Sequence, residues 1–324
     1  MVPSCEILRT TAPSAWTADI LIEMSTSAFS NCLELMGHDP YFESYQHAKL
    51  FNKVKEIYGP VSSLSQFVIS QLGGLAVLLT AEELSRLQLY QLSSIAALGS
   101  ISTWNNSQLA ALFGATLRSI AWSESQLESS TLVAMGHIVC GATPAQMKRF
   151  NPVEFSKAVL WLGKLNLSCS EEQLLTLLNL LTYSLAFGSM DTWGSDVFIE
   201  IGALAAGLPD LAMSALVKEQ IEGLTPLAIS LVPPSKLAAA FMELQLSMFS
   251  YEQAAAVTKK QLSSLSPSQV TALDIVLTSS ENRTINIRGR SLGPPLTHSP
   301  LCVTVGLLML LIALHCPDLI CPGT

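Results

Sequence analysis

Two sets of side chains in this 324-residue chain could carry chemistry, and the first is a candidate metal site. His38, Asp39, Glu43 and His47 place two imidazoles and two carboxylates in one short stretch. Imidazole nitrogens and carboxylate oxygens are groups that bind zinc and related metals. The competing interpretation is that they are exposed side chains of helices that cover the end of the fold. We adopt the second interpretation, because histidines in such positions seldom bind a metal, and expect no cofactor.

The second set is His137 and Cys140, which could act as a base and a nucleophile. Both lie in a glycine-containing turn, where a packed or disulfide-bonded cysteine is the alternative. The chain contains no G-x-S-x-G elbow, P-loop or H-E-x-x-H motif, and no G-x-G-x-x-G after a strand. The sequence therefore does not indicate an enzyme, and no small-molecule substrate is evident.

The seven cysteines are too widely spaced for a small disulfide-rich domain and include no C-x-x-C pair. Zinc ribbons and thioredoxin-like redox motifs therefore have no support. Cys5 with Cys32, and Cys140 with Cys169, are candidate disulfides among several connectivities that the spacing allows. The remaining three are Cys302, Cys316 and Cys321.

Composition excludes a nucleic-acid-binding protein. The chain has 17 Lys+Arg against 25 Asp+Glu, a net charge of -8, and cannot form the basic surface that phosphate contacts require. Only 13% of residues are charged and 49% are hydrophobic. Since soluble domains usually have about 25% charged residues, much of this chain must face protein or lipid.

A recurring pattern predicts how the chain is organised. An aliphatic-glycine pair is followed some seven to nine residues later by a helix-start signature, in which Ser, Thr or Asn stands three residues before Gln or Glu. Such a capping box joins two side chains to two unpaired backbone N–H groups at the start of a helix. The pairs end at Gly73, Gly99, Gly136, Gly163 and, in a degraded copy, Gly202. The following boxes begin at Thr80, Asn105, Thr143 and Ser170, and further boxes begin at Ser123, Ser250 and Ser266.

The spacing of leucines after these boxes, such as Leu84 to Leu92, indicates helices rather than strands. Successive glycines are about 26, 37, 27 and 39 residues apart, which is typical of stacked short helices with two connection lengths. We therefore predict an all-α fold: a right-handed superhelix of the armadillo/HEAT type, or α-solenoid, with a C-terminal hydrophobic tail. A polytopic membrane protein is the alternative explanation for the low charge, since residues 173–190 are uncharged.

This pattern divides the chain into four predicted regions. Residues 1–60 are more polar and are expected to form two or three capping helices. Residues 61–278 form the helical-repeat solenoid, residues 279–300 a stalk or spacer, and residues 301–324 a hydrophobic signal or anchor.

The C-terminal region has the composition of a glycosylphosphatidylinositol (GPI) attachment signal. Residues 301–316 are uncharged and would form roughly 24 Å of helix, less than a comfortable membrane span. Small residues and a polar spacer precede them, and Gly289 or Ser291 would suit as the lipid acceptor. A membrane tail anchor and a buried last helix are the alternatives.

Two further features bear on the cellular compartment. The N-terminal residues lack the basic region and apolar core of a secretory signal. Three N-x-S/T sequons, at Asn105, Asn166 and Asn282, would be glycosylated only in the secretory pathway.

The order of several motifs resembles the mesothelin/stereocilin/otoancorin family. A lysine-rich segment 52–60 ends near Tyr58 and Gly59, an apolar segment 67–73 closes on Leu-Gly, and a Thr-x-x-Glu helix start follows at Thr80. The resemblance covers about residues 52–280 and, with the tail, is expected to be strongest to the C-terminal part of otoancorin. Family members begin with a secretory signal and otoancorin is much longer, so the resemblance implies a truncated form.

This resemblance implies an armadillo-like superhelix and a function in adhesion. The chain would be a GPI-anchored glycoprotein on the apical cell surface that attaches an acellular extracellular gel to inner-ear epithelium. Its partners would be matrix glycoproteins of that gel or mucin-type glycoproteins, with the membrane reached through the lipid anchor. The alternative is an intracellular, tail-anchored helical scaffold that binds a partner protein.

Overall fold

The computed structural model describes residues 2–121 and 123–290, with side chains as far as residue 278. All regular structure in these residues is helical, and no strand occurs in them, which confirms the predicted all-α class. The α-helices are α1 (Cys5–Thr11), α2 (Ala18–Ile22), α3 (Thr26–Gly37), α4 (Ser44–Tyr58), α5 (Gln66–Gln71), α6 (Ala81–Ser85), α7 (Leu92–Gly99), α8 (Asn106–Ile120), α9 (Ser129–Met135), α10 (Pro144–Met147), α11 (Pro152–Leu162), α12 (Glu171–Leu181), α13 (Ser195–Ile201), α14 (Asp210–Ser214), α15 (Lys218–Gly223), α16 (Pro226–Leu231), α17 (Pro234–Ala240), α18 (Glu243–Leu246), α19 (Tyr251–Ala255), α20 (Lys259–Leu262) and α21 (Pro267–Arg290). The 3-10 helices are η1 (Pro13–Ala15), η2 (Val61–Ser63), η3 (Gly73–Leu78), η4 (Glu124–Gln126), η5 (Gly136–Gly141), η6 (Met190–Thr192) and η7 (Gly202–Gly207).

Most predicted capping boxes open helices. The boxes at Thr80, Asn105, Thr143, Ser170 and Ser250 begin α6, α8, α10, α12 and α19, with both reciprocal hydrogen bonds present. Ser266 exchanges the same two bonds with Gln269 at the start of α21. These confirmed boxes are local interactions that depend only on residues three apart.

Two local predictions are wrong. Ser123 begins only the 3-10 turn η4, and its side chain makes no capping bond; its hydroxyl is hydrogen-bonded to that of Ser125. The leucine-rich segment after Thr80 is not one helix, since α6 ends at Ser85. Leu87 and Leu89 are buried from a non-helical segment, so burial rather than helical periodicity places these leucines.

Paired glycines join successive parts of the fold. Gly73, Gly136 and Gly202 have φ between +47° and +50°, each at the start of a 3-10 helix. A Cβ atom on Gly136 would lie 2.5 Å from the carbonyl oxygen of Gly99, and the backbones of Gly73 and Gly202 approach Gly37 and Gly163 in the same way. The recurring glycines therefore allow backbone to touch backbone, and Gly37 extends the pattern into the first 60 residues.

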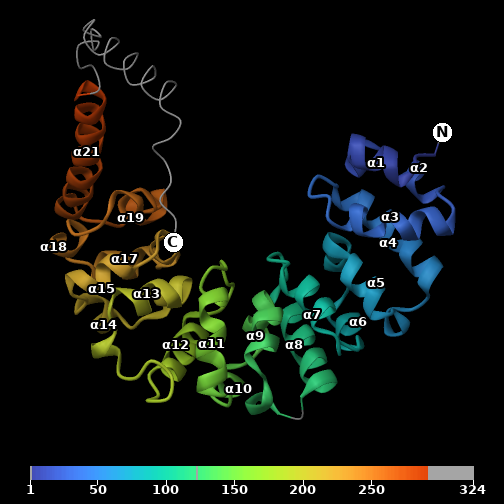
Figure 1. The fold of residues 1–324 in the computed structure, drawn as a ribbon, viewed down its shortest axis with the longest axis horizontal. Helices are drawn as coiled ribbons and strands as arrows, with labels where there is room; N and C mark the ends of the chain where they lie inside the picture. The colour runs from blue at the N-terminus through green and yellow to red at the C-terminus, as the bar shows by residue number, and fades with distance from the viewer. Residues whose placement is uncertain (1, 122, 291–324) are drawn as a thin grey trace, which may run out of the picture. The chain divides into compact units, whose positions relative to one another are not determined.

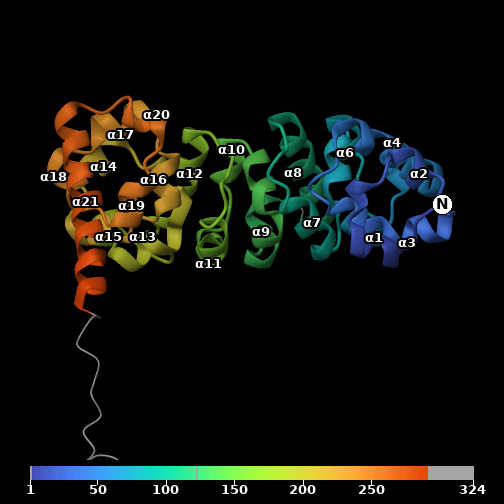
Figure 2. The same cartoon turned by 90° about the horizontal axis from the view of Figure 1, so that it is seen from above.

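Helices pack mainly against elements near them in the chain (Figure 1). One series of neighbours is α1, α3, α5, α7, α9, α11, α13 and α15. A second series packs behind it, in which α8 contacts η5 and α12 contacts η7. Figure 2 shows α9, α11 and α13 along one side and α8, α10 and α12 along the other. The buried side chains of the two series form one continuous core that includes Phe29, Phe113, Phe155, Phe198 and Phe241.

From α15 onward the chain repeats about every eight residues, a period that the sequence patterns above do not include. Helices α15 to α20 are very short, and glutamine is the third helical residue of α15, α18, α19, α20 and α21. The side-chain amide of Gln253 donates to the carbonyl oxygens of Ile221 and Leu224 at 2.7 and 2.6 Å. Gln253 therefore caps the start of its own helix, α19, and the end of the earlier helix α15.

The chain divides into two compact units, Met1–Leu277 and Thr278–Thr324. Residues 1–60 contain the four helices α1 to α4, rather than the two or three expected. Helix α21 continues to Arg290, so the first part of the predicted spacer 279–300 is helical. The hydrophobic region 301–324 lies outside the described residues.

Candidate functional site: disulfides, sequons and the His47 cavity

Cys5 and Cys32 form a disulfide that joins α1 to α3. Their Cα atoms are 5.4 Å apart, within the range of ordinary protein disulfides. Cys32 is fully buried and Cys5 is half-buried, so the bond lies at the edge of the core. It ties the first helix of the described chain to the third.

Cys140 and Cys169 form a second disulfide, with Cα atoms 4.8 Å apart. Cys140 belongs to η5, and Cys169 directly precedes Ser170, the capping residue of α12. The structure thus joins both cysteine pairs that the sequence analysis named as candidates. Because the Cys140 sulfur is bonded to Cys169, the hypothesis that Cys140 is a nucleophile with His137 as its base is wrong.

His137 is instead a buried side chain of η5. It is 4% exposed, and its Nδ1 atom has no hydrogen-bond partner among the described protein atoms. Burial lowers the pKa of His137, because removing water penalises the charged imidazolium. The histidine is therefore neutral at physiological pH and packs within the core.

Two of the three sequons present exposed asparagines. Asn105 is the N-cap of α8, where its side-chain oxygen accepts hydrogen bonds from the Gln108 N–H and the Ser107 hydroxyl. These bonds use the oxygen and leave the amide nitrogen, to which a glycan would be attached, on an exposed residue. Asn166 is exposed in the segment between α11 and α12. Asn282 lies in α21, beyond the described side chains.

The lipid-attachment candidates lie at the limit of the described chain. Gly289 is in the last turn of α21, whereas Ser291 is outside the described residues. No helix among the described residues has both the length and the apolar character to cross a membrane. The uncharged stretch 173–190 is divided, since α12 ends at Leu181.

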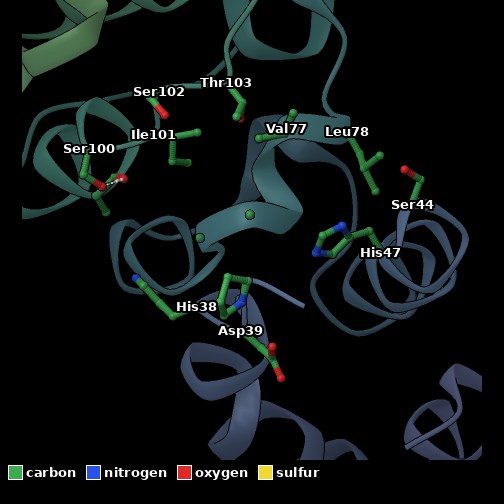
Figure 3. A pocket seen from close by; sticks show the side chains of 15 residues that line it. His38, Asp39, Ser44, His47, Val77, Leu78, Ser100, Ile101, Ser102 and Thr103 are labelled. Carbon is green, nitrogen blue, oxygen red and sulfur yellow. Dashed lines mark hydrogen bonds between the residues drawn. The ribbon is translucent and has the colours of Figure 1, made fainter. Parts of the chain in front are cut away.

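The His38–His47 region forms part of a cavity of about 540 Å³, shown in Figure 3. The cavity lies between the end of α3, the start of α4, η3 and the segment after α7. The His47 ring is directed toward it, whereas the Asp39 carboxylate points away. Its other lining residues include Ser44, Gly74, Ser100, Ser102 and Thr103.

The polar groups of this region mostly have structural partners. The two carboxylate oxygens of Asp39 accept hydrogen bonds from the backbone N–H groups of Ser14 and Tyr41, at 2.8 and 2.9 Å. Glu43 is the N-cap of α4, and the ring of His38 bonds the Glu34 carbonyl. In the part of the chain that the structure describes, no three His, Cys, Asp or Glu side chains are grouped to hold a metal ion.

His47 is the exception. Its Nε2 atom is buried without a hydrogen-bond partner among the described protein atoms, and it lies against Gly74. Burial lowers the pKa of His47, and the nearby negative charge of Asp39 partly opposes this shift. The sequence analysis found this histidine but not the cavity, because Gly74 and the segment 100–103 come from distant parts of the chain.

The pKa of the Glu154 carboxylate is also shifted, and the cause is structural. Hydrogen bonds from Lys157 and from the Ser129 backbone N–H lower the pKa of Glu154 to about 2. The bond to Ser129 caps the start of α9 from the neighbouring helix α11. The low pKa therefore reflects helix capping and indicates no catalytic role.

Sequence comparisons relate most of the chain to two groups of proteins. Over 246 residues, or 76% of the chain, it is 42% identical to stereocilin from Mus musculus and 41% identical to stereocilin from Homo sapiens. Over 222 residues it is 27% identical to otoancorin from Mus musculus. No family model matches the chain.

These comparisons correct one expectation and set the scale of the similarity. Identity is higher to stereocilin than to otoancorin, so the expected preference for otoancorin is wrong. The chain spans only 14% of the length of stereocilin and 19% of that of otoancorin.

Proposed function

The chain belongs to the stereocilin/otoancorin family, and from this premise we propose that it is a cell-surface adhesion glycoprotein of the inner ear, attached to the apical membrane by a GPI anchor. Its role would be to attach an acellular extracellular gel to the epithelium. The partners would be matrix glycoproteins of that gel or mucin-type glycoproteins. The premise comes from homology, and the finer statements come from features of this chain.

The observation that carries this proposal is the pair of disulfides. Disulfides persist in secreted and cell-surface proteins and are rare in the reducing cytosol. Cys5–Cys32 and Cys140–Cys169 both join separate elements, so each restricts the unfolded chain as structural disulfides do. They favour the extracellular proposal over an intracellular tail-anchored scaffold.

The surface of the chain supports the same location. Asn105 and Asn166 are exposed on a folded surface and are accessible to glycosylation. The small residues near Gly289, followed by the uncharged segment 301–316, fit the sequence requirements for GPI attachment.

We further propose that residues 61–278 form a right-handed α-solenoid of the armadillo/HEAT type, capped by residues 1–60. Packing between elements close in the chain, and the glycine pairs that recur between them, support this architecture. A solenoid has a large surface for its size, which suits a protein that binds an extended matrix.

The test of this function is expression of the full chain in mammalian cells. We expect N-glycosidase to increase its gel mobility, and expect Asn105→Gln, Asn166→Gln and Asn282→Gln together to abolish that shift. Mobility should also differ between reducing and non-reducing gels, and the double variant Cys140→Ser/Cys169→Ser should reduce this difference.

Lipid anchoring has a separate readout. Phosphatidylinositol-specific phospholipase C should release the glycosylated chain from intact cells, and a variant in which both Gly289 and Ser291 are replaced by bulky residues should not reach the surface. A chain that remains unglycosylated when fused to a signal peptide, or that stays membrane-bound after phospholipase treatment, would contradict the proposal and favour the tail-anchored alternative.

A further inference from the structure

A row of exposed apolar side chains crosses four neighbouring helices, α7, α9, α11 and α13, which pack in this order. Each member of the row lies three residues before a glycine, which is either the last residue of its helix or the residue directly after the helix. The four members therefore share one register. The residue just before each member is buried in the core, so the row lies at the outer edge of the packed face. The row comprises Ala96, Val133, Leu160 and Ile199, all exposed.

The side chains of this row increase in size along the chain. Ala96 and Val133 are small, whereas Leu160 is 40% exposed and Ile199 is 57% exposed. The residues that directly follow Leu160 and Val133 differ in size in the same way. Helix α11 carries the exposed Trp161 at this position, whereas α9 carries the half-buried Ala134. The half of the surface on α7 and α9, here called the low half, therefore carries small side chains. The half on α11 and α13, the projecting half, carries large ones.

Charge is distributed in the same two-part manner. Helices α7 and α9 contain no charged residue, so the low half of the surface is neutral. Glu128, the N-cap of α9, is exposed at its edge, and α11 carries the exposed Lys157 at nearly the same level. The low half thus ends in the negative charge of Glu128. The projecting half carries Lys157 beside its ion-pair partner Glu154, and α13 adds the carboxylates of Asp196 and Glu200.

We propose that this surface binds a second copy of the same chain about a two-fold axis that runs parallel to α9 and α11 and passes between them. Such an axis places α11 on the partner's α9 and α13 on the partner's α7, and keeps the register of the row. Leu160 then faces the partner's Val133, and Ile199 faces the partner's Ala96.

The surface fits itself because small side chains meet large ones at every position. Trp161 covers the partner's Ala134, and Lys157 approaches the partner's Glu128, once on each side of the axis. A two-fold contact requires this property, since the same surface must serve both copies. The same match is the reason to prefer a second copy over an unrelated partner. The proposal does not depend on the function proposed above.

The first test is the mass of the full chain by sedimentation velocity. The unmodified chain should sediment with twice the mass of one copy. Ile199→Lys should weaken dimerisation by about tenfold or more, because it places a desolvated charge against the partner's Ala96. The matched control is Leu211→Lys on α14, which is 85% exposed outside the row and should leave the dimer unchanged.

The decisive variant adds the complementary charge. Ala96→Glu alone should also weaken the dimer, and Ala96→Glu combined with Ile199→Lys should restore it. Because α9 and α11 lie between α7 and α13 within one chain, only two different copies can bring these positions together. A double variant as weak as the single variants would overturn the proposed axis.

A cross-linking experiment checks the pairing directly. In chains with Cys302, Cys316 and Cys321 changed to Ser, a copy carrying Ala96→Cys mixed with a copy carrying Ile199→Cys should form a disulfide-linked dimer. Two copies that both carry Ala96→Cys should not. A chain that remains monomeric at about 0.1 mM, or a dimer that Ile199→Lys and Leu211→Lys leave equally intact, would refute the proposal.

Discussion

At the scale of single residues, Gly73, Gly136 and Gly202 combine a positive φ with close backbone contacts. Gly136 meets two conditions at once: its φ is +47°, and a Cβ atom there would collide with the Gly99 carbonyl. Gly188 meets only the first, with φ at +76° and no atom within 4 Å of the position that a Cβ atom would occupy. A substitution at Gly188 would therefore introduce backbone strain alone, whereas a substitution at Gly136 would introduce both backbone strain and a steric collision.

We predict that Gly136→Ala lowers the free energy of unfolding by more than about 3 kcal/mol, because the backbone of η5 must move away from α7. Gly188→Ala should cost only about 1 kcal/mol, the strain of a left-handed conformation with a side chain. Urea unfolding of both variants would measure the difference. Equal costs would mean that the Gly99–Gly136 contact can relax freely.

The burial of His137 predicts that the stability of the fold depends on pH. Its pKa is lowered in the folded state from the ordinary value of 6.5, so the unfolded state binds protons first as the pH falls. The stabilisation is complete above the unfolded pKa and is lost as the pH falls through 6.5 toward the folded pKa. Measured by urea unfolding at pH 7.5 and 5.5, His137→Leu should show a smaller loss of stability than the unmodified chain. An identical loss in both would show that His137 does not contribute to acid sensitivity.

At the scale of elements, the glutamines of five capping boxes, Gln108, Gln173, Gln253, Gln261 and Gln269, each connect two elements. In each case the side-chain oxygen caps the glutamine's own helix, and the side-chain nitrogen caps the end of an element about 30 residues earlier. Gln253 is 3% exposed, so both ends of its amide depend on these bonds. Helices α15 to α20 are too short to be stable alone, and these glutamine hydrogen bonds help to join them.

We predict that Gln253→Glu lowers the free energy of unfolding by about 3 kcal/mol at neutral pH. The carboxylate retains the acceptor for Ser250 but faces the carbonyls of Ile221 and Leu224 without a donor. This environment raises the pKa of the introduced carboxyl, so its protonation should reduce the defect as the pH falls toward about 4.3. Urea unfolding at pH 7 and 5 tests this, with the exposed Gln88→Glu as the matched control. A defect that does not change with pH would rule out this role for the amide.

At the scale of the whole molecule, the described fold is built mainly from contacts between elements close in the chain. Each helix depends on a few neighbours, and the continuous core follows the series of helices along the chain. The disulfides lie in different parts of the chain, so each stabilises its own neighbourhood. The solenoid proposed above would present an extended surface, which fits both the proposed adhesion role and the proposed dimer.

The sequence by itself determined the helical class, six of the helix starts and the positions of the repeating glycines. These depend on residues three or four apart, or on backbone constraints specific to glycine, so they can be read locally. Leu87 and Leu89 show the limit, because apolar spacing could not distinguish a helix from a buried irregular segment.

Only the tertiary structure decided which residues these features bring into contact. The pairing of Gly99 with Gly136, the reach of Gln253 to α15 and the closure of the cavity beside His47 all join residues tens of positions apart. The exposed row from Ala96 to Ile199 also emerges only when four separate helices are packed in register. Local preference carries no information about such contacts, because the packing of helices brings these residues together.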